Sequence, residues 1–327
     1  MLYLPKRLML MLTNKCNSHC VHCNVWKNKD IPFNLNYDKA KEIITDFTKL
    51  CLSEDIKQYH ELNFTGQGEP TLYNKLWDLI RYAKDIDPTN RVTKSIITNS
   101  INLTKDNIID KILYSKIDMV IFSINSHIPD VHDYSRGTKD NYEHIMIIVK
   151  EIYDYKIKHN LEFPKLCISS MIADWNYDHF IEFIDYMESI KYFSYFTFAV
   201  MAWTVKEKKW LSKNYEISQV IKKCQEKYKD SIFLKYPYHI YNEMIGYALQ
   251  GEEYHTFSYC RSAHNNLITD ENLNLQNCFS KNEIMLGNLK NNTLIEIINK
   301  PFVQKLLQVR MKGNCNLWCA QSTCMWS

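Results

Sequence analysis

Residues 7–23 read RLMLMLTNKCNSHCVHC, an apolar run of β-strand type that leads directly into three cysteines. Cys16, Cys20 and Cys23 have the spacing C-x3-C-x2-C, and thiolates at such short spacings can converge on one iron–sulfur cluster. A cubane held by only three protein thiolates leaves one iron free to bind another ligand. The stretch therefore predicts a reactive site directly after the first strand.

A zinc site is the alternative interpretation of the same cysteines. Structural zinc sites normally have four ligands at similar spacings, and His19 or His22 could supply the fourth. Cys/His segments serve both metals, so the spacing by itself leaves both open. With zinc, the chain would be a non-enzymatic zinc-binding interaction protein.

The composition gives no support for nucleic acid or a membrane as the main partner. Lys and Arg total 40 against 37 Asp and Glu, a formal net charge of +3. There is no signal peptide and no apolar stretch long enough to span a bilayer. Eleven cysteines, grouped at short spacings, indicate metal binding in a reducing cytoplasm more than a disulfide framework.

Residues 7–200 alternate apolar β-type runs with amphipathic helical patterns, which is typical of parallel βα units. Strands are predicted at 7–12, 61–65, 92–98, 119–125, 165–171 and 193–200, and helices at 37–51, 73–84, 104–114, 142–158 and 178–190. Six units are too few to close an eight-stranded barrel. The expected fold is therefore α/β, with residues 1–200 forming a partial (β/α)6 barrel.

The remainder of the chain divides into two predicted parts. Residues 201–255 have helical spacing and predict a helical bridge. Residues 256–327 predict a small further domain, with a hairpin turn at 270–272 and one helix from about 294 to 309. Five cysteines of this tail indicate a second metal site: Cys260, Cys278, Cys315, Cys319 and Cys324.

A second motif, GQGEP at residues 66–70, follows the second predicted strand. Two of the seven glycines of the chain fall here, and glycine lets backbone approach a ligand closely. Glu69 offers an acceptor or a charge partner, and Pro70 fixes the exit of the chain. A plain strand-to-helix turn is the alternative, but it rarely needs two glycines and a glutamate together.

With the cysteine triad after strand one and Gly68, Glu69 and Pro70 after strand two, the chain resembles the radical S-adenosylmethionine superfamily. In that family three thiolates hold a [4Fe–4S] cluster, and its fourth iron binds the amino and carboxylate groups of S-adenosylmethionine. The resemblance implies that the three cysteines are the cluster ligands. It also implies that residues 68–70 hold the methionyl end.

The resemblance extends to about residue 200 and implies further contacts with S-adenosylmethionine. Asn99 and Ser123 would lie near the ribose or the carboxylate, and Arg136 would pair with the carboxylate. His22 occupies the place of a family aromatic residue near the adenine. Polar strand ends, surface arginines and exposed loop histidines are also common without such roles.

The tail resembles the auxiliary-cluster extension of the family, the SPASM domain or its shortened twitch form. Five cysteines cannot fill two clusters of four, so the resemblance implies one auxiliary [4Fe–4S] cluster. Cys260, Cys278 and Cys315 are the expected ligands, with Cys319 or Cys324 as the fourth. A tail zinc site is the alternative, since thiolates suit both metals.

Two smaller features bear on the tail resemblance. The segment Gly287-Asn-Leu289, followed by a helix and then cysteines, supports it. No glycine precedes Cys278, so Asn272 or Asn274 is expected to take the turn instead.

The resemblance implies an enzyme whose cluster reduces S-adenosylmethionine to methionine and a 5′-deoxyadenosyl radical, which removes hydrogen from an unactivated C–H bond. The auxiliary cluster would then assist a net oxidation, either dehydrogenation or peptide crosslinking. An external donor such as flavodoxin or ferredoxin would supply electrons. The alternative outcome is epimerisation, with Cys324 or Cys167 as the hydrogen donor.

The substrate is expected to be a small molecule or a peptide. The first strand begins by residue 7, which leaves no room before it for a leader-binding domain. This favours a small-molecule or sugar-type substrate, although a separate leader-binding protein would restore the peptide.

Overall fold

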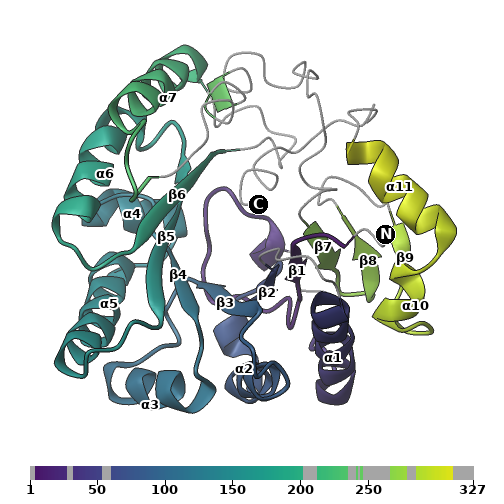
Figure 1. Ribbon diagram of the computed structural model, residues 1–327. Helices are drawn as coiled ribbons and strands as arrows, with labels where there is room; N and C mark the ends of the chain where they lie inside the picture. The colour runs from purple at the N-terminus through teal and green to yellow at the C-terminus, as the bar shows by residue number, and fades with distance from the viewer. Residues whose placement is uncertain are drawn as a thin grey trace.

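The computed structural model describes residues 4–27, 32–53, 60–201, 212–234, 266–277 and 285–311, together with Tyr241, Met244 and Ile245. Its centre is a nine-stranded sheet with the order β6-β5-β4-β3-β2-β1-β7-β8-β9 (Figure 1). Neighbouring strands from β6 to β7 are parallel, and β8 and β9 are added antiparallel.

The parallel strands are β1 (Arg7–Met9), β2 (His60–Phe64), β3 (Val92–Thr98), β4 (Met119–Ser123), β5 (Lys165–Ile172), β6 (Tyr195–Val200) and β7 (Asn266–Thr269). The helices among and after the first six are α1 (Tyr37–Ser53), α2 (Leu76–Asp85), α3 (Lys105–Ser115), α4 (Pro129–Arg136), α5 (Asn141–Lys158), α6 (Phe180–Ser189) and α7 (Asn214–Lys227). The C-terminal part adds β8 (Asn274–Gln276), β9 (Met285–Asn288), α10 (Leu294–Ile298) and α11 (Pro301–Met311). Short 3-10 turns lie at Val25–Lys27, Pro70–Leu72 and Tyr177–His179.

The two faces of the sheet carry different side chains, because successive residues of a strand point to opposite faces. Leu62 and Phe122 belong to the large core that the helices cover on the outer side of the curved sheet (Figure 1). Met119, Ile121 and Cys167 form a small separate cluster on the other face. The inner face is therefore distinct from the main core.

The predicted α/β fold with a mainly parallel sheet is confirmed. All six predicted strands and five predicted helices are present, and their bounds differ by at most three residues. The predicted helix at 294–309 is wrong in one respect, because it is two helices, α10 and α11. Pro301 begins the second helix, since proline has no N–H to donate and its ring blocks continuation of a helix through it.

The predicted hairpin at 270–272 is confirmed, but its turn residue differs from the expectation. Leu273, not Asn272 or Asn274, takes the left-handed conformation, with φ of 61°. The Asp270 carboxylate accepts the backbone N–H groups of Asn272 and Asn274, both at 2.8 Å. Both asparagines are thereby held, and the residue between them makes the reversal.

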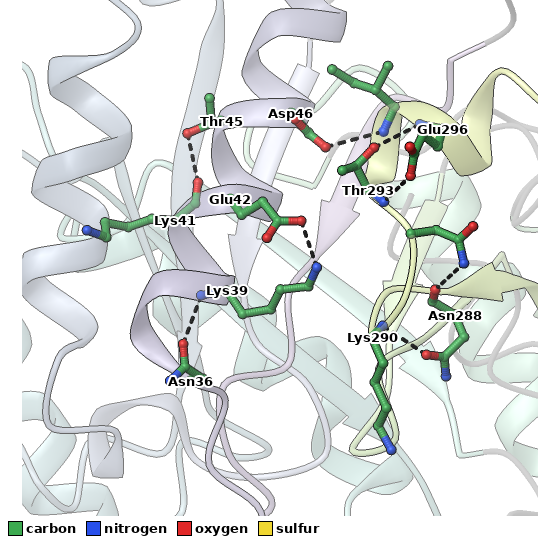
Figure 2. Close-up of polar contacts among 12 residues, drawn as sticks. Asn36, Lys39, Lys41, Glu42, Thr45, Asp46, Asn288, Lys290, Thr293 and Glu296 are labelled. Carbon is green, nitrogen blue, oxygen red and sulfur yellow. Dashed lines mark hydrogen bonds and ion pairs between the residues drawn. The ribbon is translucent and has the colours of Figure 1, made fainter.

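The C-terminal part contacts α1, one of the helices that cover the parallel sheet (Figure 2). Thr293 and Glu296 form a capping box at the start of α10, in which each side chain accepts the backbone N–H of the other. The buried Asp46 of α1 accepts the next N–H, from Ile295, at 3.4 Å. A carboxylate near a helix N-terminus is stabilising, so α1 supports α10 directly.

Some predictions lie outside the described residues. α7 is helical as expected within 201–255, but the division into domains at 200 and 255 stays a prediction. The five tail cysteines at positions 260, 278, 315, 319 and 324 are also outside the described ranges. None of the helices in the described ranges has the length and apolar character that crossing a membrane requires.

Candidate functional site

The three cysteines of the triad lie on the loop that leaves the carboxyl end of β1. Cys20 is buried, Cys16 and Cys23 are half-buried, and none of them forms a disulfide. The carboxyl ends of β2, β3 and β4 lie beside this loop, because parallel strands end at the same edge of the sheet. The structure therefore places the triad where α/β proteins bind ligands.

The turn at residues 66–70 contacts the start of the cysteine loop. A Cβ atom on Gly68 would come within 2.4 Å of the carbonyl oxygen of Thr13 and 2.5 Å of that of Lys15. The backbone N–H of Glu69 donates to the Lys15 carbonyl oxygen at 2.8 Å. Only glycine permits this approach, so the two sequence motifs are brought together through Gly68.

The opposite side of the cysteine loop is held by the C-terminus of α4. The backbone N–H groups of His19 and Val21 donate to the carbonyl oxygens of Arg136 and Ser135, at 3.1 and 3.2 Å. The last carbonyls of a helix have no partner within it, and the cysteine loop supplies one here. Gly137 follows with φ of 58°, where a Cβ would lie 2.2 Å from the His19 carbonyl oxygen.

Each thiol of the triad has a polar neighbour. Cys16 Sγ lies 3.9 Å from Asn99 Nδ2, Cys20 Sγ lies 3.3 Å from Ser18 Oγ, and Cys23 Sγ accepts the backbone N–H of Val25 at 3.4 Å. Hydrogen bonds to sulfur stabilise the thiolate form and tune the potential of iron–sulfur clusters. The neighbours therefore fit the triad as a set of cluster ligands.

Burial favours the protonated form of two thiols of the triad, Cys16 and Cys23. Desolvation raises the pKa of Cys16 to about 11, and it also raises the pKa of Cys23 above its ordinary value. Both are therefore neutral thiols at pH 7 in the chain without a metal. Metal ligands must be deprotonated, so cluster assembly on this loop releases protons.

Within the ranges that the structure describes, no three His, Cys, Asp or Glu side chains form a group that could hold a single metal ion. A cubane binds each cysteine through a different iron, so its ligands need not converge on one point as zinc ligands do.

The Glu69 side chain is used to hold the site together. Glu69 is buried, and its carboxylate accepts hydrogen bonds from Thr71, Thr98 and the backbone of Asn99. The distances lie between 2.6 and 3.1 Å, and they join the end of β2 to the end of β3. The predicted role of residues 68–70 toward the methionyl end stays a prediction.

The remaining predicted residues lie near the same edge. Asn99 is buried at the end of β3 and donates to Asn17 of the cysteine loop at 2.9 Å, whereas Ser123 is half-buried at the end of β4. Arg136 is the last residue of α4, and its buried Nε has no hydrogen-bond partner among the described residues. That atom is a donor available to an anionic ligand.

His22 stacks on Trp175, with ring centroids 6.0 Å apart and an interplanar angle of 20°. Desolvation, and secondarily the charge of Arg136, lowers the pKa of His22 to about 3, so the imidazole is neutral. Its buried Nδ1 has no hydrogen-bond partner among the described residues. Trp175 lies in the loop after β5, and no motif in the sequence singles it out.

Residues 10–187, more than half of the chain, match the family described as the radical SAM superfamily. The chain belongs to the radical SAM superfamily. This membership agrees with the positions of the triad and of the Gly68 turn at the carboxyl edge of the sheet.

Curated relatives of this radical SAM chain include the mycofactocin maturase MftC of Mycolicibacterium smegmatis, 27% identical over 179 residues. That alignment covers 55% of this chain and 41% of MftC. The AdoMet-dependent heme synthase of Methanosarcina barkeri is 25% identical over 167 residues, which cover 48% of this chain and 44% of the synthase. The chain thus matches less than half the length of these relatives.

Solved structures show the same fold at low identity. SuiB of Streptococcus suis, bound to S-adenosylmethionine, has a TM-score of 0.65 and 14% identity, and the match covers 94% of this chain and 68% of SuiB. The enzyme anSMEcpe, with bound AdoMet and a peptide, has a TM-score of 0.64 and 13% identity, with coverages of 95% and 86%. At such identity the likeness establishes the fold alone.

Proposed function

We propose that this chain is an enzyme that uses a [4Fe–4S] cluster on Cys16, Cys20 and Cys23, together with S-adenosylmethionine, to remove hydrogen from an unactivated carbon. When bound, the pair supplies reductive cleavage of the sulfonium to methionine and a 5′-deoxyadenosyl radical. The observation that carries the proposal is the contact of Gly68 with the carbonyls that begin the cysteine loop. It joins the two motifs on which the family resemblance depends.

The residues of the chain have separate tasks in this proposal. The three cysteines give up their protons on loading, and the Asn99 amide and the Val25 N–H remain beside the sulfurs of Cys16 and Cys23 as donors. Superfamily membership and the SAM-bound structural neighbours support the cluster and the cosubstrate.

Arg136 and His22 are proposed to bind the two ends of S-adenosylmethionine. The guanidinium Nε of Arg136, which has no hydrogen-bond partner among the described residues, suits a carboxylate. The neutral His22 ring on Trp175 suits a flat apolar group such as adenine. Ser123 is proposed near the ribose.

We extend the proposal to the architecture and the tail. The curved parallel sheet would act as a partial (β/α)6 barrel, and residues 256–327 would form a twitch or SPASM-like domain with one auxiliary [4Fe–4S] cluster. The parallel pairing of β7 with β1 supports a tail close to the reactive loop. An auxiliary cluster there would assist a net oxidation.

The proposed substrate is a small molecule or a peptide, and the proposed reductant is an acidic electron-transfer protein such as flavodoxin or ferredoxin. One similar structure supports a peptide, since anSMEcpe was solved with a bound peptide. Lys15 and Lys27 are exposed on the cysteine loop and suit an acidic partner.

Anaerobic incubation of the reconstituted chain with S-adenosylmethionine and dithionite tests the proposal. We expect 5′-deoxyadenosine from the wild type and none from Cys20→Ala. Cys224→Ala is the matched control, because Cys224 is buried in α7 within the main core and lies far along the chain from the triad. Absence of 5′-deoxyadenosine at full cluster loading would contradict the proposal.

Epimerisation is the second candidate, and the position of Cys167 favours it. Cys167 lies on the inner face of the sheet with Met119 and Ile121, and burial raises the pKa of its thiol to about 12. The thiol therefore keeps its hydrogen at neutral pH and could return it to a substrate radical. An unchanged product from Cys167→Ala would remove this residue from that role.

A further inference from the structure

A buried histidine outside the predicted site connects the cluster loop to two strand ends. His132 of α4 is completely buried, and its Nδ1 accepts the backbone N–H of Asn125 at 3.2 Å. Because a backbone N–H can only donate, the proton of the neutral ring must be on Nε2. Desolvation, and secondarily Arg136, lowers the pKa of His132 to about 3, which agrees with a neutral ring.

The protonated Nε2 of His132 determines the orientation of Asn141. Nε2 lies 3.1 Å from Asn141 Oδ1, which must therefore accept. The other end of the same amide, Nδ2, donates to the backbone carbonyl oxygen of Asn99 at 3.1 Å. A reversed amide would place two donors together at His132 and two acceptors together at Asn99.

The hydrogen bonds from His132 through Asn141 to Asn99 form a relay, and it ends at Asn99 beside the cysteine loop. Its backbone N–H donates to Glu69 at 2.8 Å, and its side-chain Nδ2 donates to Asn17 at 2.9 Å and lies 3.9 Å from Cys16 Sγ. The carbonyl held by Asn141 is thus part of the same residue that contacts the cysteine loop.

His132 also belongs to the helix that holds the other side of the loop. Ser135, one turn later in α4, donates its hydroxyl to the His132 carbonyl oxygen at 2.7 Å and accepts from Asn125 Nδ2 at 3.0 Å. The backbone carbonyl of Ser135 accepts the N–H of Val21. Both sides of the cysteine loop are therefore connected to His132.

We propose that His132 is a positioning residue for the cluster loop and for S-adenosylmethionine, acting through Asn141 on Asn99. The inference rests on the proposed function, because it assigns a supporting role at that site. His132 touches neither thiol nor cosubstrate in this role. It fixes the direction of a hydrogen-bond chain that ends beside Cys16.

Two conservative variants separate the two hydrogen bonds of the ring. In His132→Asn, the amide oxygen can replace Nδ1 as the acceptor for Asn125, but the donor to Asn141 is lost. In His132→Gln, the amide nitrogen can replace Nε2 as the donor to Asn141. Asn141→Asp keeps an acceptor for His132 but cannot donate to Asn99 when ionised.

The test is an anaerobic titration of the reconstituted full-length chain with S-adenosylmethionine, followed by the EPR spectrum of the reduced cluster. Loss of supporting partners around a metal site typically weakens binding about 10–100-fold. We expect His132→Asn and Asn141→Asp to need at least about tenfold more S-adenosylmethionine for the spectral change, at wild-type iron content. His132→Gln should titrate like the wild type.

His144→Ala is the matched control, because His144 Nε2 bonds the neighbouring carbonyl of Ser100 at 3.0 Å without joining the relay. It should titrate like the wild type. If His132→Asn and Asn141→Asp titrate like the wild type, the inference is overturned and the proposed function stands. An equal shift in His144→Ala would have the same consequence. No spectral response in the wild type at full cluster loading would instead overturn the proposed function and the inference with it.

Should His132→Asn fail to fold, Asn141→Asp decides the outcome by the same titration. A variant that folds and loads iron but titrates like the wild type contradicts the relay. Circular dichroism and the iron and sulfide content of each variant establish which variants are folded and loaded, and only those are compared.

Discussion

At Gly68 a hydrogen atom stands where any other residue would carry a carbon. The carbonyl oxygens of Thr13 and Lys15 lie 2.4 and 2.5 Å from the position of that carbon. Backbone atoms cannot move aside as the end of a side chain can. The contact between the two motifs is therefore specific to glycine.

Gly68→Ala is expected to displace the cysteine loop and to lower the free energy of unfolding by about 1–3 kcal/mol. Urea unfolding and the iron content after reconstitution measure the two effects. Gly66→Ala is the matched control, since its new Cβ would meet mainly the Met11 side chain, at 2.8 Å. Equal losses in both variants would contradict the role assigned to Gly68.

The neutral state of His132 predicts a pH dependence of stability. Burial holds the pKa of its ring at about 3 against an ordinary value of 6.5, so between these values the unfolded chain binds a proton that the folded chain does not. Stability is therefore retained above pH 6.5 and falls as the pH is lowered. From pH 7 to 5 this residue alone should remove about 2 kcal/mol.

Urea unfolding of the wild type and of His132→Gln at pH 7 and pH 5 checks this prediction. The wild type should lose about 2 kcal/mol more than the variant over this interval. Equal losses would show that the imidazole is already charged in the folded chain.

At the scale of elements, regular alternation made the strands and the long helices predictable. β3 (Val92–Thr98) has the predicted bounds, because its apolar run and the polar residues at its ends are both visible in the local sequence. α4 was missed, since its sequence PDVHDYSR has no apolar periodicity. Its helix is stabilised by contacts with residues far away in sequence, including the cysteine loop that it holds.

The pairing of β7 with β1 could also not be predicted from the sequence, because no local pattern indicates which distant strand is the partner. The two motifs of the site were predictable from residue types and spacing. Their connections through Glu69, Asn141 and α4 were not, since polar residues at strand ends gave no direction for their hydrogen bonds.

β7 contributes a side chain to the strand that leads into the triad. The hydroxyl of Thr269 accepts the buried backbone N–H of Met11 at 2.9 Å. Thr269→Val leaves that N–H without its partner and should lower the free energy of unfolding by about 1–3 kcal/mol. Thr269→Ser keeps the hydroxyl and should stay closer to the wild type; chemical unfolding of both variants decides whether this bond matters.

On the scale of the whole molecule, the C-terminal part is continuous with the parallel sheet. β7 is the neighbour of β1 on the side opposite β2, and α10 packs against α1. Removing residues 256–327 would leave the edge of β1 unpaired and would expose the surface of α1 that α10 covers. An exposed central strand promotes aggregation.

The truncated chain 1–255 is therefore expected to aggregate or to lose cooperative unfolding. Size-exclusion chromatography and circular dichroism measure both properties. A monomeric, cooperatively folded 1–255 would show that the first six strands and their helices fold independently of residues 256–327.

Metal analysis of an anaerobically reconstituted variant without the five tail cysteines tests the central claim most directly. In this variant the described triad of Cys16, Cys20 and Cys23 is the proposed cluster site. We expect about four iron and four sulfide per chain, as one [4Fe–4S] cluster requires. Zinc bound without iron or sulfide would contradict the account.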